Sequence, residues 1–230
     1  MLDVLREEKK YKMSKIQLSY VKSQLSMVMQ GDSFHGLNSY LVRSLYFDSY
    51  TDIDLFEKEA GLSERKKIRL RIYSPKDTKA KLELKAKSGC MQHKRSLTIS
   101  KEDAQELIKG NYNVLLRYDE DIAMEFYRIM SMNLYRPKCV VEYDRIALMA
   151  PENSIRVTID TDVRSNEGEF DIFSEKLQTY PVMEKDQGVL EVKYNRFLPS
   201  YIKIMLNSVN KVETSVSKYV LARKFSGGGN

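Results

Sequence analysis

The feature that most constrains this fold is the alternation of charged and apolar residues in three closely spaced segments. In RKKIRLRIY, Arg69 and Arg71 fall at positions that alternate with Ile68 and Leu70. KLELKAK has the same period, and a third alternating segment follows it. Successive side chains of a strand point to opposite faces. The pattern therefore predicts strands at about 65–73, 81–87 and 92–99, each with a basic face and an apolar face.

The remaining patterns predict further strands with amphipathic helices between them. Strands are expected at about 4–13, 40–47, 138–149, 155–162 and 189–195. Helices are expected at about 52–60, 100–109, 120–132, 199–209 and 214–223. One further helix is expected to start at Ser14, which caps it, and to end at Gly31. The apolar face of that helix holds Ile16, Leu18, Val21, Leu25 and Val28. These elements indicate an α+β fold, a closed antiparallel β-barrel (a tunnel) with a polar basic lumen, flanked by amphipathic helices. We expect a single domain over 1–225 and a flexible tail at 226–230.

Composition favours an anionic partner and carboxylate metal ligands. The chain has 38 Lys and Arg against 32 Asp and Glu, a formal net charge of +6. Two cysteines without a CxxC spacing and two histidines, His35 and His93, cannot form a Cys- or His-rich metal site. Carboxylates remain as ligands for a hard cation. With no apolar run that could span a bilayer and no leader-like N-terminus, we expect a cytoplasmic protein without a membrane segment.

The charged strand faces have two interpretations. They are solvated outer faces, as is common in antiparallel sheets, or they line an enclosed polar lumen. Arg and Lys dominate these faces, whereas a solvated face usually mixes both signs. Like charges on neighbouring strands repel, so a surface that holds Arg69, Arg71, Lys85 and Lys94 needs an anion. Closing the sheet would enclose these cations and turn the apolar faces outward, under the helices.

Eight segments, in order along nearly the whole chain, resemble the VTC domain of stand-alone bacterial type. This domain is the polyphosphate polymerase branch of the triphosphate tunnel metalloenzymes. LREEKKYKMS resembles its opening strand, YLVRSLYFDS its second strand and RKKIRLRIY its paired-arginine strand, and LELKAK with HKRS supplies two further lysines. VVEYDRIA is similar to the Y-x-R strand, IRVTIDTDVR to the next strand, GVLEVKYN to the strand with the late glutamate, and SVSKYVLA to the C-terminal S-K helix.

The resemblance implies a metal-dependent enzyme that transfers the γ-phosphoryl group of ATP to a growing inorganic polyphosphate chain. The catalytic residues that it implies are Arg69, Arg71, Lys85, Arg145, Lys218 and Glu191. The substrate-binding residues are Lys10, Lys94, Lys87, Tyr143, Arg156, Lys193 and Ser217, where Tyr143 braces Arg145 and Ser217 donates a hydrogen bond. For Mn²⁺ or Mg²⁺, Glu191 is the first choice of ligand. Glu8 and Glu83 are second choices, which either bind the metal or orient a neighbouring lysine.

Several of these residues also have a simpler structural interpretation. For each of these carboxylates the alternative role is an ion pair with an adjacent Arg or Lys. Asp160 and Asp162 extend the metal site or, as we favour, form ion pairs at the rim. Lys87 stands where a family histidine follows the fourth-strand lysine, and Ser215 where the helix often carries a lysine; both departures bear on affinity rather than on reaction class.

Three rival functions stay open at this point. A tunnel triphosphatase would use water in place of the polyphosphate chain as the acceptor. A non-catalytic module would bind polyphosphate without turnover. A nucleic-acid-binding barrel has the least support, since the tyrosines follow no base-stacking pattern and no specific nucleic-acid contact is predicted.

Overall fold

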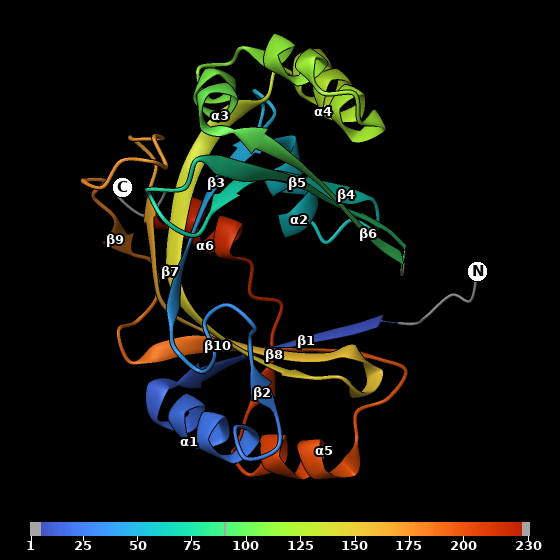
Figure 1. Ribbon diagram of the computed structural model, residues 1–230, viewed down its shortest axis with the longest axis vertical. Coiled ribbons are helices and arrows are strands. Elements are labelled where there is room, and N and C mark those ends of the chain that lie inside the picture. Colours follow the sequence, from blue (N-terminus) through green and yellow to red (C-terminus); the bar gives the residue numbers. More distant parts are fainter. Residues whose placement is uncertain (1–5, 90, 227–230) are drawn as a thin grey trace. The chain divides into compact units, whose positions relative to one another are not determined.

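The structure is a computed structural model in which residues 6–89 and 91–226 are described. Its strands are β1 (Arg6–Ser14), β2 (Gln30–Gly31), β3 (Tyr40–Asp48), β4 (Arg65–Ile72), β5 (Lys79–Ser88), β6 (Met91–Ser100), β7 (Arg136–Ala150), β8 (Ile155–Asn166), β9 (Tyr180–Pro181), β10 (Gln187–Asn195) and β11 (Val212–Glu213). Its helices are α1 (Lys15–Leu25), α2 (Ile53–Glu59), α3 (Lys101–Ile108), α4 (Asp121–Met132), α5 (Ser200–Asn207) and α6 (Lys218–Ser226), with short 3₁₀ turns at Tyr112–Arg117 and Glu152–Ser154 (Figure 1).

The strands form an antiparallel-dominated sheet in an α+β fold, as predicted. The order of hydrogen-bonded neighbours is β11-β1-β10-β8-β7-β3-β4-β5-β6, with β2 and β9 attached to β7 and β8. Every pairing with a described register is antiparallel. Among the described residues this order has two ends, β11 and β6, with no pairing between them. Closure into a barrel therefore stays a prediction.

The chain divides into two compact units, each assembled from separate stretches of sequence. Unit 1 comprises Met1–Leu41, Tyr143–Val163 and Pro181–Ser217, and unit 2 comprises Val42–Glu142, Arg164–Tyr180 and Lys218–Asn230. Strands β3, β7 and β8 each contain a point at which the chain passes from one unit to the other. The polar residues of interest fall into both units and are described unit by unit below.

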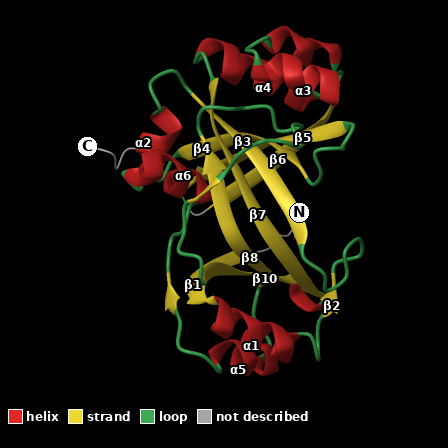
Figure 2. Cartoon of the chain, turned by 90° about the vertical axis from the view of Figure 1, so that its left-hand side faces the viewer, coloured by secondary structure: helices red, strands yellow, loops and turns green. Residues whose placement is uncertain are grey.

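Unit 2 buries the apolar faces of β4, β5 and β6 under helices. Ile68, Leu70 and Leu82 are fully buried in one hydrophobic cluster with residues of α3 and α4, such as Leu107 and Phe126. Both helices lie on the same side of these strands (Figure 2). Truncating one of these buried side chains to Ala would cost about 2–5 kcal/mol. The prediction that the apolar faces of these strands lie under amphipathic helices is confirmed.

Unit 1 repeats this arrangement with different elements. Val157 on β8 and Leu190 on β10 pack in a second cluster with Leu18 of α1 and Ile202 of α5. Ser14 caps α1 through the predicted capping box with Gln17, whose backbone N–H donates to the serine hydroxyl at 3.3 Å. The opposite faces of β1, β8 and β10 carry the charged residues.

Two expected helix ends and one residue of an expected buried helix face are wrong. Helix α1 ends at Leu25 rather than at Gly31, and Ile16 is 83% exposed instead of lying on the buried face. Gly31 is in β2, where a Cβ would lie 2.2 Å from the carbonyl carbon of Gly36, so close backbone contact explains this glycine. Helix α6 starts at Lys218 rather than near 214, because Val212–Glu213 pairs with β1.

The ends of the chain are only partly described. Residues 4 and 5 of the first predicted strand and 227–230 of the predicted tail lie outside the described residues, and Ser226 belongs to α6. Within the described parts of the chain, the helices are too short or too polar to cross a membrane.

Candidate functional site

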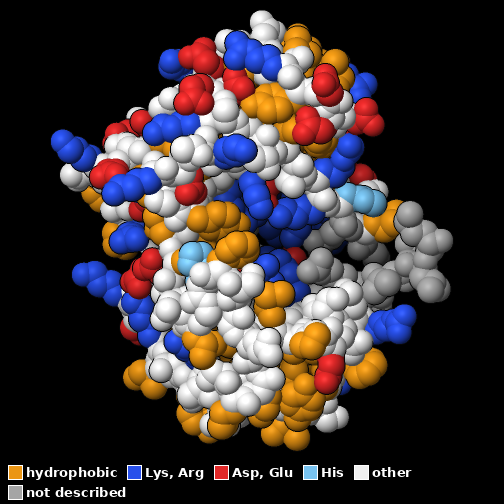
Figure 3. Space-filling view, viewed as in Figure 1, with side chains coloured by type: hydrophobic (Ala, Val, Ile, Leu, Met, Phe, Trp, Pro, Cys, Tyr) orange, Lys and Arg blue, Asp and Glu red, His pale blue; other side chains and the backbone are white. Residues whose placement is uncertain are grey.

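In unit 2, strand register places a row of cations across three neighbouring strands. We define the β4–β6 basic face as Lys67, Arg69, Arg71, Lys81, Glu83, Lys85 and Lys94. Lys85 lies opposite Lys67 on one side and Lys94 on the other, and Arg69 lies opposite Glu83. Lys and Arg side chains gather over these strands in Figure 3. The alternation predicted this face correctly, and the register shows which cations are neighbours.

Glu83 is the centre of the basic face. One of its carboxylate oxygens lies 2.6 Å from Arg69 Nε and 3.6 Å from Arg71 Nη1, and the other lies 2.5 Å from Lys94 Nζ. Burial alone would raise the pKa of Glu83, but these cations hold the pKa well below its usual range. Both carboxylate oxygens are therefore occupied by cations. The structure shows the plainer role expected for Glu83, ion pairs with adjacent cations, and this geometry favours an orienting residue over a metal ligand.

The polar face is itself partly buried, which differs from a fully solvated outer face. Glu83 is 3% exposed and Arg71 7% exposed, whereas the outer faces of solvated sheets keep their charges in water. Lys94 keeps 56% of its side chain exposed. Exposure thus differs between members of the face, since Arg71 and Glu83 are buried whereas Lys81 and Lys94 are exposed. One buried carboxylate beside three cations leaves an excess of positive charge that suits an anionic ligand.

In unit 1, β1 and β10 bring two carboxylates and two lysines together. The register pairs Glu8 with Lys193 and Lys10 with Glu191. Lys10 Nζ lies 2.7 Å from Glu8 and 4.0 Å from Glu191, while Lys193 Nζ lies 2.5 Å from Glu191 and 3.8 Å from Glu8. We call these four residues the β1–β10 network. The predicted site residues of these strands are therefore in mutual contact.

The carboxylates of the β1–β10 network form ion pairs, the plainer role expected for them, and could hold a divalent cation if Lys10 and Lys193 turned away. Burial alone would raise the pKa of Glu191, but Lys193 and Lys10 lower it overall, so the carboxylate is ionised near neutral pH. Glu8 and Glu191 offer hard oxygen donors of the kind that Mg²⁺ and Mn²⁺ prefer, beside waters and phosphate oxygens. Among the described residues no group of three or more His, Cys, Asp or Glu side chains forms a complete metal cage. Waters or substrate phosphates would complete the coordination of a bound cation.

Arg145 is fixed by a buried carboxylate. Its Nε and Nη2 donate to the two oxygens of Asp160 at 2.6 and 2.7 Å, and Asp160 is fully buried. Burial disfavours the charged guanidinium, yet Asp160 raises the pKa of Arg145 well above its usual value. The Tyr143 ring lies 5.1 Å from the guanidinium carbon, in agreement with its predicted bracing role. Asp160 forms the ion pair that we favoured, although inside the protein rather than at the rim; Asp162 pairs with Lys15 at 2.8 Å.

Comparison with known protein families identifies the family of this chain. The model of the VTC domain family matches residues 5–226. The chain belongs to the VTC domain family. No protein with curated annotation matches the sequence significantly.

Solved structures similar to this VTC domain extend the comparison to the fold. A candidate adenylate cyclase from Bacillus halodurans superimposes with a TM-score of 0.53 and 14% identity, over 92% of this chain and 96% of that chain. A candidate adenylyl cyclase from Hippeastrum, described as having a dominant triphosphatase activity, gives a TM-score of 0.56 and 17% identity, over 95% of this chain and 96% of that chain. At these identities the likeness concerns the fold alone.

The remaining predicted residues of the VTC domain occupy β5, β8 and the start of α6. Lys87 lies on β5 opposite Arg65. Arg156 lies 4.0 Å from Asp32, and its Nε is buried without a hydrogen-bond partner among the described residues. Ser217 directly precedes α6, and Lys218 is its first residue. The expectation that the residues of both units share one lumen stays a prediction.

The alternating pattern puts Thr158 of the VTC domain in a polar row with Arg156 but gives it no role, and it does not indicate Tyr46. Thr158 lies opposite Glu191 on β8, 5% exposed, and its hydroxyl has no hydrogen-bond partner among the described residues. Tyr46 lies opposite Arg69 and its hydroxyl accepts from Arg69 Nη1 at 3.3 Å. Neither residue carries a charge, so the charge pattern assigns neither of them a role. For Tyr46, its shared strand face with Ser44 is the signal that could have indicated it.

Proposed function

We propose that this VTC domain is a polyphosphate polymerase, which transfers the γ-phosphoryl group of ATP to a growing inorganic polyphosphate chain. The observation that carries the proposal is the family match over 5–226, since the VTC domain resemblance implies this reaction. The β4–β6 basic face supports it, because phosphoryl transfer depends mainly on positioning and on cations around oxygens where charge develops. We expect the reaction to take place in the cytoplasm.

The residues of unit 2 would bind phosphate groups. Arg69 and Arg71 present guanidinium forks suited to two phosphate oxygens at once, and Lys85 and Lys94 supply compact charges. Glu83 orients Arg69 and Lys94 before the substrate arrives. Because the cations are already held, little ordering is needed when phosphate binds.

The residues of unit 1 would hold the metal and further phosphates. Glu191 is the proposed ligand of Mn²⁺ or Mg²⁺, with Glu8 beside it, and Lys10 and Lys193 would turn from these carboxylates to phosphate oxygens. A bound divalent cation neutralises charge on the transferring phosphoryl group. Arg145, fixed by Asp160, would bind the phosphate that carries developing charge.

The transfer requires no protein nucleophile. A terminal phosphate oxygen of the chain forms a bond to the γ-phosphorus of ATP, the bond from that phosphorus to the β–γ bridging oxygen breaks, and ADP leaves. The attacking phosphate is already ionised near neutral pH. Arg and Lys side chains, together with a divalent cation that the carboxylates would hold, are therefore enough for the proposed reaction.

A second candidate is a triphosphatase, in which water accepts the phosphoryl group. The Hippeastrum protein, with a similar fold, is described as having that dominant activity. The same cations would bind the same triphosphate, so product analysis has to separate the two reactions. A module that binds polyphosphate without turnover is a third outcome.

Incubation of the purified protein with ATP and Mn²⁺, followed by sizing of the products on gels, tests the proposal. Long chains support polymerisation, orthophosphate without chains supports the triphosphatase, and neither product supports the binding module. Glu191→Gln should abolish turnover and weaken Mn²⁺ binding measured by calorimetry. Glu184→Gln, which alters an exposed carboxylate of the same unit, is the matched control. Full turnover by E191Q would refute the metal assignment.

A further inference from the structure

The first turn of α6 is anchored by a buried phenol. Tyr219, which directly follows Lys218, is 1% exposed, and its hydroxyl donates to Asp48 Oδ2 at 2.6 Å. Burial and the negative charge of Asp48 raise the pKa of Tyr219 well above its usual value. The phenol therefore remains a proton donor, and its position determines where Lys218 begins the helix.

Asp48 is a rigid acceptor for that phenol. It is fully buried and accepts three backbone N–H groups, those of Ser49 and Asp54 on Oδ1 at 2.7 and 2.9 Å and that of Leu55 on Oδ2 at 2.9 Å. Backbone donors cannot rotate away as side chains can. The hydroxyl of Tyr219 thus meets a carboxylate whose orientation is set by the main chain between β3 and α2.

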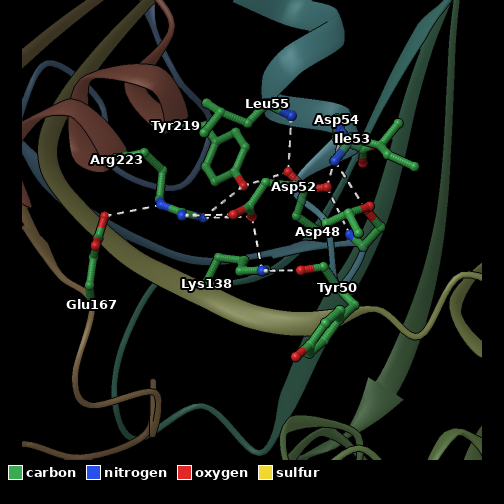
Figure 4. A network of polar contacts seen from close by, with 12 residues as sticks. Asp48, Tyr50, Asp52, Ile53, Asp54, Leu55, Lys138, Glu167, Tyr219 and Arg223 are labelled. Carbon is green, nitrogen blue, oxygen red and sulfur yellow. Dashed lines mark hydrogen bonds and ion pairs between the residues drawn. The ribbon is translucent and has the colours of Figure 1, made fainter. Parts of the chain in front are cut away.

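A second anchor lies one helical turn further along α6. Arg223 donates to both oxygens of Asp52 at 2.9 and 3.1 Å, and Lys138 Nζ lies 2.9 Å from the same carboxylate (Figure 4). Residues four apart share a helix face, so Tyr219 and Arg223 fix the same side of α6. Two directional contacts on one face determine both the position and the rotation of this short helix.

The first anchor also contacts the basic face. The rings of Tyr46 and Tyr219 are stacked, with centroids 5.1 Å apart and an interplanar angle of 21°. Tyr46 in turn accepts a hydrogen bond from Arg69, which is paired with Glu83. A continuous series of contacts therefore runs from Asp48 through the two stacked tyrosines to Arg69. A displacement of Tyr219 would disturb Lys218 and Arg69 together.

We propose that Tyr219 is a positioning residue, which holds Lys218 and Arg69 ready for the phosphates of one substrate. The inference rests on the proposed function, in which both cations bind phosphate groups. Its physical basis is preorganisation, because a cation that is already ordered loses less entropy when the ligand arrives. Tyr219 itself does not need to touch the substrate, and its hydroxyl acts through Asp48.

Calorimetric binding of inorganic tripolyphosphate, which needs no turnover, tests this role. Tyr219→Phe keeps the stacked ring and removes only the hydroxyl. It should weaken binding about tenfold, the effect of losing one hydrogen bond to a charged group. In a Lys218→Gln background the same substitution should have a smaller effect, because the ordering of Lys218 no longer contributes. Arg223→Gln removes the second anchor together with the 3.4 Å hydrogen bond that Arg223 Nη1 donates to the Tyr219 hydroxyl, and it should weaken binding in the same way.

Tyr118→Phe is the matched control. Tyr118 donates to Asp103 at 2.7 Å in the same unit, so its loss removes a similar phenol–carboxylate bond away from α6 and should leave binding unchanged. Y219F that binds tripolyphosphate with the wild-type affinity would overturn the positioning role. The same holds if Y219F weakens binding equally with Lys218 present and in the Lys218→Gln background. Neither result would affect the proposed function. Failure of the wild-type protein to bind tripolyphosphate would instead refute the proposed function.

Discussion

Replacing Glu83 by Gln should destabilise the protein, because three cations would lose their shared counter-ion. Arg71 is nearly as buried as Glu83, whereas Arg69 and Lys94 retain 25% and 56% of their side chains exposed. Breaking a buried pair costs about 3–5 kcal/mol, and exposed pairs contribute only about 0–1 kcal/mol. We therefore expect a loss of about 3 kcal/mol at neutral pH, at the lower end of the buried range. That corresponds to a fall in Tm of roughly 6–12 °C for a chain of this size.

The loss of stability expected for Glu83→Gln also depends on pH, and it should be smaller at low pH. The pKa of Glu83 is depressed in the folded protein, so its ion pairs stabilise the fold fully above the unfolded pKa of about 4.3. This contribution declines as pH falls further toward the folded pKa, by about 1.4 kcal/mol per pH unit. The difference in stability between wild type and E83Q should therefore narrow below about pH 4.

Urea denaturation of both proteins at several pH values measures this difference. Glu175→Gln is the control, because Glu175 forms an exposed pair with Lys76 and its loss should change stability by less than about 0.5 kcal/mol. An E83Q protein as stable as E175Q at neutral pH would refute the idea that Glu83 compensates the basic face. So would a difference that stays constant from pH 7 to pH 3.

Two further substitutions test buried polar groups. Burial, with a smaller contribution from Asp48, raises the pKa of Asp54 to about 6. The free energy of unfolding should therefore fall by about 3 kcal/mol as pH rises from 4 to above 6. Asp54→Asn should remove this pH dependence in urea titrations, and an unchanged pH profile of the variant would contradict the prediction. Thr158→Val should raise the free energy of unfolding by about 1 kcal/mol, because a methyl group replaces a buried hydroxyl without a partner among the described residues. Thr158→Ser is the control for T158V, and a loss of stability in T158V would show that the hydroxyl is satisfied.

The local structure was predictable where the sequence is periodic. Alternation predicted β4, β5 and β6 within a few residues, and the serines at positions 14 and 100 cap their helices as expected. The errors lie where distant segments determine the outcome. The sequence predicts a helix end at Gly31, but the close approach of Gly36 explains this glycine. No strand is predicted at Val212 and Glu213, because their pairing with β1 leaves no local signal.

The candidate site shows the same division. Family resemblance and alternation predicted Arg69, Glu191 and Lys10 as site residues. Their neighbours on adjacent strands are given by the strand register in the structure. The burial of Asp160 beside Arg145 could not be predicted, because it depends on how β7 and β8 pack. The anchors of α6 were also missed, since Tyr219 and Asp48 are 171 residues apart in the chain.

The division of the chain into interleaved stretches has a consequence for synthesis. Unit 1 needs Ile202 and Leu206 of α5 to complete its core, and unit 2 needs α6 to supply Tyr219. On the ribosome, neither unit can therefore finish folding while its last segment is still in the exit tunnel. The nascent strands would remain incomplete until α6 has been translated, a period in which chaperones can bind them.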